Sequence, residues 1–141
     1  MRYLSIDYGT KRSGLAICDA SETIVSPFGV VKDRKKLLEK IVSLIKTENI
    51  DAIVLGLPLN MDDSEGPQAR LVQRFAERLK KNINVPIHFQ DERLSSFSAE
   101  EKLAYAELSR AKKRERIDAV AAAEILEAFL ERKKDGQNTH L

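Results

Sequence analysis

Residues 2–19 constrain the fold most, because their pattern fits two short strands joined by a tight turn. Polar residues separate the apolar positions of the first strand, which are Leu4, Ile6 and Tyr8. A turn bounded by glycines follows and the apolar run resumes over residues 15–18, so the stretch predicts a β-hairpin. Asp7 breaks this pattern with a carboxylate near the end of an apolar strand. Burying a charge is unfavourable without a partner, so Asp7 is either a cap for the turn or a metal ligand.

The composition describes a single globular domain. The chain has 141 residues, of which 43% are hydrophobic and 33% charged, and we expect one domain over residues 1–132 and a polar, frayed tail over 133–141. No apolar run approaches the roughly 20 residues of a membrane span, and the N-terminus leads straight into a strand, which is untypical of a signal peptide. Cys18 is the only cysteine, so no internal disulfide forms. These features predict a cytoplasmic protein without a membrane partner.

Beyond the hairpin, strand patterns and helix patterns take turns. We expect strands over residues 23–31, 51–55 and 85–90, and helices over 33–49, 67–81, 98–108 and 116–132. Asp33 is expected to cap the first helix, and Pro67 to stand in the first turn of the second. Residues 109–116 lack apolar periodicity, which predicts a loop or disorder. The element order predicts an α/β fold: a mixed five-stranded sheet, with three antiparallel strands and then parallel ones, flanked by helices on both faces.

Three acidic residues occupy unusual positions in this pattern. Asp7 lies late in the first strand, Glu92 just past a buried strand, and Asp118 in the first turns of the last helix. Helical spacing places Asp118 on a small, apolar face that should press against the sheet, although an acid there could simply favour the positive end of the helix. If the strand ends and the last helix converge, three oxygen donors meet, which suits Mg²⁺ or Mn²⁺. Such a site could hydrolyse phosphodiester bonds.

Four motifs, in order along residues 1 to about 130, resemble the YqgF (RuvX) family. The matching segments are Asp7–Gly14, Gly56–Met61 with Glu65–Gln68, Asp91–Leu94 and Ile117–Ala123. These are small bacterial proteins of the RNase H-like fold, named as Holliday junction resolvases and as pre-16S rRNA nucleases. The resemblance implies that Asp7, Glu92 and Asp118 form a catalytic triad that binds Mg²⁺ or Mn²⁺. Asp63 stands where the family usually has glycine, and Asp tolerates a positive φ better than most residues.

Several polar residues near these acids are candidates for binding substrate. The set is Lys11, Arg12, Asn60, Arg93, Arg110, Lys112, Lys113 and Arg114. Lys11 and Arg12 would hold a phosphate near the metal or merely solvate the hairpin tip, and Arg93 would contact phosphate or pair with Asp91 and Asp118. For Asn60 an ordinary turn role competes with contact to a water or phosphate. The basic residues of 110–114 directly precede Asp118, which favours contact with a nucleic-acid backbone over a solvated surface.

These observations predict a metal-dependent endonuclease that acts on structured nucleic acid. The resemblance alone points to the 5′ end of pre-16S rRNA as substrate, and resolution of Holliday junctions in DNA is the main alternative. A resolvase should be a stable dimer, whereas we expect a monomer or weak homodimer. A non-catalytic RNA-binding factor in ribosome assembly is a further alternative. A sugar-kinase-like enzyme would need a second domain, for which 141 residues leave no room.

Overall fold

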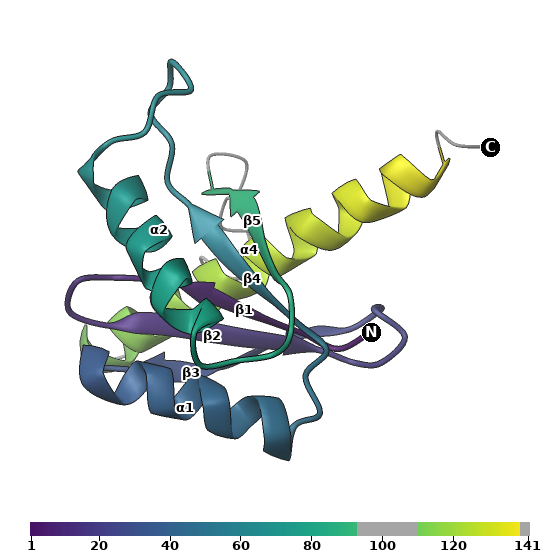
Figure 1. Ribbon diagram of the computed structural model, residues 1–141, viewed down its shortest axis with the longest axis horizontal. Helices are drawn as coiled ribbons and strands as arrows, with labels where there is room; N and C mark the ends of the chain where they lie inside the picture. Colours follow the sequence, from purple (N-terminus) through teal and green to yellow (C-terminus); the bar gives the residue numbers. More distant parts are fainter. Residues whose placement is uncertain (93–109, 139–141) are drawn as a thin grey trace.

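A five-stranded mixed sheet forms the centre of the computed structural model, which describes residues 1–92 and 110–138, with the side chains of 118–136 in the second range. The strand order is β3-β2-β1-β4-β5 (Figure 1). The strands are β1 (Tyr3–Asp7), β2 (Ser13–Cys18), β3 (Val25–Val31), β4 (Ala52–Leu57) and β5 (Ile87–Asp91). The first three strands pair antiparallel, and β4 runs parallel to both β1 and β5. The predicted hairpin and the predicted mixed sheet are therefore confirmed.

Helices α1 (Arg34–Thr47) and α2 (Pro67–Lys80) cover one face of the sheet. The Asp33 side chain accepts a hydrogen bond from Lys35 N, so it caps α1 as predicted. The first helix ends where Asn49 adopts a left-handed backbone with φ 52°. Pro67 stands in the first turn of α2, also as predicted. Apolar side chains of both helices pack on those of β1, β2 and β4, and together they bury the larger part of the core.

Helix α4 (Arg110–Asn138) lies across the opposite face of the sheet, behind it in the view of Figure 1. Small residues let this helix come close, because Ala16 on β2 packs against Ala122 and Ala123. The buried hydroxyl of Ser5 donates a 2.6 Å hydrogen bond to the Ala122 carbonyl and so ties β1 to the helix. Further along, Phe129 packs edge-on against Tyr3. The alternation of β1 therefore sends Ser5 and Asp7 towards α4, and Leu4, Ile6 and Tyr8 towards the other layer.

The last helix is longer at both ends than the sequence predicts. Residues 110–116 are helical, so the predicted loop was wrong there: lysine, arginine, alanine and glutamate are good helix formers, and a helix without an apolar stripe leaves no periodic signal. At the other end the helix continues to Asn138, beyond the predicted end at 132. Lys133 anchors that extension through hydrogen bonds to Tyr3 (3.0 Å) and Glu22 (2.6 Å).

The remaining boundaries differ from the predicted ones by at most two residues. The predicted helix over 98–108 lies outside the described residues. Within the described part of the chain, no helix combines the length and the apolar character that crossing a bilayer requires. The division into a domain over 1–132 and a tail over 133–141 stays a prediction. Helix α4 runs across this predicted boundary and continues to Asn138.

Candidate functional site

The three predicted acids come together at one edge of the sheet, on the face that α4 covers. Asp7 is the last residue of β1, and Glu92 directly follows β5. The parallel strands β1, β4 and β5 end on the same side of the sheet, with β4 between the other two, so Asp7 and Glu92 flank the end of β4. Asp118 lies about two turns into α4, and its charge acts on Asp7. The strands and the last helix therefore converge as the sequence predicts.

Asp7 and Glu92 form a hydrogen-bonded carboxyl pair. Two carboxyl groups can share a hydrogen bond only when one of them keeps its proton. Burial, together with the negative charge of Asp7 and the hydrogen bond to it, raises the pKa of Glu92 to about 8. Burial also raises the pKa of Asp7, although the hydrogen bond from Glu92 opposes that shift. Glu92 is therefore the proton donor and Asp7 the acceptor of this pair.

Asp118 is held by a different partner, the guanidinium of Arg12. The two side chains form a hydrogen-bonded ion pair, in which 35% of the Arg12 side chain and 17% of the Asp118 side chain are exposed. Arg12 comes from the turn between β1 and β2, so the pair links the hairpin to α4. Neither of the two roles considered for Arg12 anticipated this contact. Arg93, the partner that we considered for Asp118, lies outside the described residues.

Two glycines make room for this arrangement. Gly14 is paired with Asp7 in the β1–β2 register, and a Cβ on Gly14 would overlap the backbone carbonyl of Asp118. A Cβ on Gly56 of β4 would overlap the Glu92 carboxylate and lie 2.6 Å from Ile125 Cδ1. Neither glycine was predicted to be part of the site. The signal that could have found them is a glycine inside a strand pattern, which often marks the close approach of another segment.

The other candidates for substrate binding occupy three places. Lys11 is exposed in the β1–β2 turn. Asn60 lies in the loop after β4, where its amide donates a 3.0 Å hydrogen bond to Ser64 Oγ, as expected of a turn residue. Asp63 in the same loop has φ 69°, which confirms the positive φ expected at this position. Arg110, Lys112, Lys113 and Arg114 belong to the first turns of α4, about 6–12 Å before Asp118 along the helix axis. Their contact with substrate stays a prediction.

The carboxylates of Asp7, Glu92 and Asp118 are suited to a hard cation, but in this structure they do not surround a common point. Among the described residues, no three His, Cys, Asp or Glu side chains form a group that could hold a metal ion as they stand. Asp7 and Glu92 offer two carboxylates at hydrogen-bonding distance, and Asp118 would have to exchange Arg12 for the ion. Oxygen ligands of this kind fit Mg²⁺ or Mn²⁺ in chemistry and in charge.

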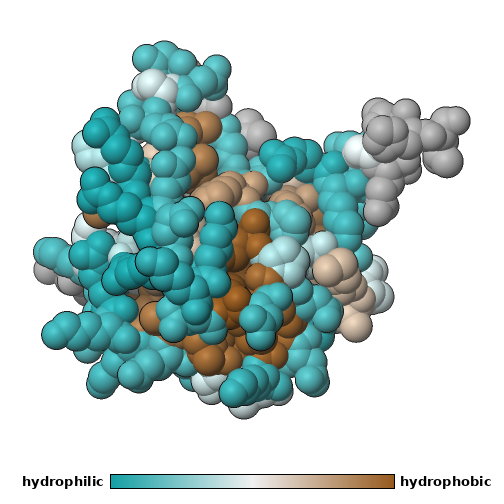
Figure 2. Space-filling view, in the orientation of Figure 1, coloured by the Kyte–Doolittle hydropathy of each residue, from teal (hydrophilic) through white to brown (hydrophobic). Residues whose placement is uncertain are grey.

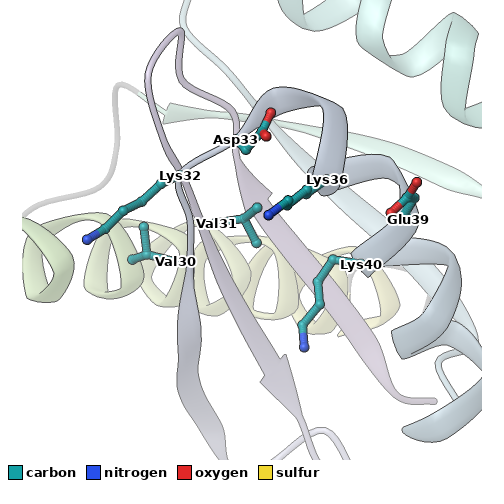
Figure 3. Close-up of a pocket in the computed structure, with 7 residues that line it drawn as sticks. All are labelled: Val30, Val31, Lys32, Asp33, Lys36, Glu39 and Lys40. Atoms are coloured by element: carbon teal, nitrogen blue, oxygen red, sulfur yellow. The ribbon is translucent and has the colours of Figure 1, made fainter.

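A hollow of about 610 Å³ lies away from these acids, between β3 and the first half of α1. Figure 3 shows Lys36 and Lys40 of α1 projecting over it beside Val31. None of Asp7, Glu92 and Asp118 lines this hollow. The acids instead lie at the carboxyl ends of the strands, on the face that α4 covers.

Two solved structures of similar architecture are described as resolvases or as bound to a Holliday junction. A structure of RuvC from Thermus thermophilus in complex with a Holliday junction substrate has a TM-score of 0.56 and 13% identity, and the match covers 95% of this chain and 96% of that one. The Fowlpox virus Holliday junction resolvase matches with a TM-score of 0.51 and 17% identity, over 94% and 99% of the two chains. At these identities the likeness shows the fold, which is the RNase H-like fold predicted from the sequence.

Relatives in sequence are much more similar. A protein of Maridesulfovibrio salexigens is 40% identical over 134 residues, which is 94% of this chain and 99% of that protein, and its name is "Putative pre-16S rRNA nuclease". A protein of Anaeromyxobacter sp. (strain Fw109-5) with the same name is 42% identical over 133 residues, covering 93% and 97%. The model of the RuvX family, described as Holliday junction resolvase, matches residues 1–132. This chain therefore belongs to the RuvX family.

Proposed function

We propose that this protein is a metal-dependent endonuclease that hydrolyses phosphodiester bonds of structured RNA, in the maturation of the 5′ end of pre-16S rRNA. The observation that carries the proposal is the convergence of Asp7, Glu92 and Asp118 at one edge of the sheet. Three carboxylates are costly to gather unless a cation offsets their charge. In this structure a proton and a guanidinium offset the negative charge of the carboxylates. The proton is that of Glu92, whose pKa is raised, and the guanidinium is that of Arg12, which pairs with Asp118.

The residues have distinct roles in this proposal. Asp7 and Glu92 would hold Mg²⁺ or Mn²⁺, and Asp118 would complete the set of ligands. When bound, such an ion supplies an activated water and charge stabilisation for the leaving oxygen. Arg12, once displaced from Asp118, would face the phosphate of the substrate together with Lys11. The basic first turns of α4, with Arg110 to Arg114, would follow the nucleic-acid backbone next to the site.

The choice of RNA rests on the relatives of about 40% identity that are named for pre-16S rRNA. The family description and the structural neighbours instead name Holliday junctions, so resolution of branched DNA is the second candidate. We also propose that the protein acts in the cytoplasm, where ribosomes are assembled, and that it is a monomer or a weak homodimer. A protein that resolves junctions should form a stable dimer, because it cuts two strands symmetrically.

The test is a cleavage assay with Mn²⁺ or Mg²⁺ on two substrates, a pre-16S transcript and a four-way DNA junction. We expect the wild-type protein to cut the transcript near its mature 5′ end, and Asp7→Asn to lose this cleavage by at least about a hundredfold. Glu39→Gln is the matched control, because it removes an exposed carboxylate from α1 and should cut normally.

Three outcomes would change the proposal. Selective cleavage of the junction would make the protein a resolvase. Unchanged cleavage by Asp7→Asn would reject the assignment of the carboxylates. Binding of the transcript without cleavage under any metal condition would make the protein a non-catalytic assembly factor.

A further inference from the structure

A second group of polar side chains is centred on Tyr8, which directly follows β1. This group lies on the face of the sheet that α1 and α2 cover, opposite the carboxylates. The Tyr8 ring is buried and stacks on Phe75 of α2, with ring centroids 4.4 Å apart. Its hydroxyl oxygen accepts a 3.0 Å hydrogen bond from Arg34 Nε in the first turn of α1. The same oxygen accepts a second, 3.4 Å bond from Arg78 Nη2 in the last turn of α2. Two guanidinium groups from different helices therefore meet at one phenol.

Stacking contacts hold these two cations in place. The guanidinium carbon of Arg34 lies 5.3 Å from the centre of the Tyr8 ring, and that of Arg78 lies 5.6 Å from the centre of the Phe75 ring. Gln68 fixes the backbone beneath them through a 3.1 Å hydrogen bond from its amide to the Tyr8 carbonyl. Arginine loses less freedom on binding when its planar group is already oriented in this way.

Neither cation has an anionic partner within the described residues. The acidic neighbours in sequence are engaged elsewhere, since Asp33 caps α1 and Glu77 contacts Lys80. Two like charges side by side repel each other. Within the described part of the chain, each guanidinium gives one of its five donors to Tyr8, so the other donors are open to a ligand. A ligand that suits the two guanidinium groups would therefore carry negative charge and several acceptor oxygens.

The position of this group relates it to the candidate active site. Asp7 and Tyr8 are consecutive, and their side chains point to opposite faces at the end of β1. The β1–β2 turn, the start of α1 and the start of α4 all lie at the same edge of the sheet, on the left in Figure 1. Lys11 is exposed in that turn, and hydrophilic side chains cover α1 and α2 on the face seen in Figure 2. A chain of phosphates that passes around this edge would meet both faces.

We propose that Arg34 and Arg78, held by Tyr8, form a clamp for one phosphate of a nucleic-acid backbone on the face opposite the carboxylates. This inference rests on the proposed nuclease function and extends it by naming a second contact with the substrate. Paired guanidinium forks match the oxygens of a phosphate, and two of them give a bidentate site that a single exposed lysine cannot. Substrate would then be anchored on one face of the sheet and cut on the other.

The experiment measures binding and not cleavage, in an Asp7→Asn background, by fluorescence anisotropy of a labelled RNA hairpin with single-stranded flanks. We expect Arg34→Gln and Arg78→Gln each to weaken binding about three- to tenfold, and the double variant to lose little more than either single one. The slope of log K against log salt should fall by the equivalent of about one phosphate in all three variants. Lys46→Gln at the far end of α1 removes the same charge and should change the affinity by less than about twofold.

A second variant separates the clamp from general positive charge. Tyr8→Phe keeps the ring stack and both arginines but removes the oxygen that holds them, so we expect weaker binding with an unchanged salt slope. Inorganic phosphate should compete with the RNA for the wild-type protein and not for the double arginine variant.

Two results would overturn the clamp. One is a double variant that binds like the parent, and the other is a double variant whose affinity and salt slope fall by the sum of both single losses, as two separate contacts would require. Either result leaves cleavage by the wild-type protein untouched. Conversely, loss of binding in the double variant of a protein that cuts nothing would support the clamp and reject the nuclease.

Discussion

The guanidinium of Arg12 is paired with the carboxylate of Asp118, although 106 positions of sequence separate the two residues. The pair joins the β1–β2 turn to α4 and neutralises one of the three acids of the site. A cation that needs Asp118 as a ligand must therefore compete with Arg12. Arg12 therefore offsets negative charge at the site, and it is also a proposed contact for substrate.

Replacing Arg12 should strengthen metal binding. We expect Arg12→Gln to bind Mn²⁺ on the order of tenfold more tightly than wild type, because a positive charge a few ångströms from the carboxylates opposes a divalent cation. Titration followed by electron paramagnetic resonance of free Mn²⁺ measures this. Lys11→Gln removes the same charge from the exposed turn and should have a smaller effect. Equal affinities for Arg12→Gln and wild type would mean that Arg12 does not compete with the cation at this site.

Gly14 should not tolerate a side chain. The Cβ of Gly14→Ala would overlap the backbone of Asp118, and backbone cannot move aside as a flexible side chain can, so α4 must shift. We expect the free energy of unfolding to fall by about 1–3 kcal/mol or more, with loss of cleavage. Urea denaturation measures the first effect. Gly29→Ala on β3 is the matched control, since its Cβ would meet nothing within 4 Å, and it should leave stability nearly unchanged.

Gly56 should separate activity from stability. In Gly56→Ala the new Cβ would overlap the end of the Glu92 side chain, which can rotate away, and would also press on Ile125 Cδ1. We therefore expect cleavage to fall by more than tenfold while the unfolding free energy changes by less than it does in Gly14→Ala. Paired measurements of kcat and of urea denaturation decide this. A Gly56→Ala protein with full activity would mean that Glu92 does not need its present position.

The metal-free protein should lose stability as pH rises from about 4.5 to about 8. Folded Glu92 keeps its proton up to a pKa of about 8, whereas its ordinary pKa is 4.5, so the folded state binds more protons in that window. The free energy of unfolding then falls as pH rises, by at most about 1.4 kcal/mol per pH unit for this one group.

Thermal unfolding in a chelating buffer across that range measures the slope. In Glu92→Gln the titrating group is gone, so the slope should become markedly shallower. Glu39→Gln, which removes an exposed carboxylate, should keep the wild-type slope. A Glu92→Gln protein with the wild-type pH dependence would contradict the assignment of this proton to Glu92.

Sequence patterns were sufficient where a residue's role depends on its own neighbours. The alternation around Leu4 and Ile6, the cap at Asp33 and the proline at position 67 each predicted local structure that the protein has. Asp7 and Asp118 could be selected because each carboxylate interrupts an apolar pattern, and Glu92 because it lies just past a buried strand. The element sequence predicted a mixed sheet, whereas the strand order that brings the acids together comes from the structure.

The failures concern contacts between distant segments. The sequence around Arg12 does not predict that it pairs with Asp118. Nor does the sequence around Arg34 and Arg78 predict that both contact Tyr8. The extra turns of α4 were missed because exposed helices of lysine and arginine have no apolar period, and because Lys133 is fixed by Tyr3 and Glu22 from elsewhere in the chain. Long-range pairing of this kind is set by the packed fold and not by the sequence nearby.

The order of the chain gives the site a temporal character. Asp7 and Glu92 belong to the part that leaves the ribosome first, whereas Asp118 arrives with the helix that closes against Gly14 and Gly56. Until that helix docks, two carboxyl groups stand at the strand ends without the third. A chain in which that helix has not packed onto the sheet would therefore be unable to assemble the proposed site.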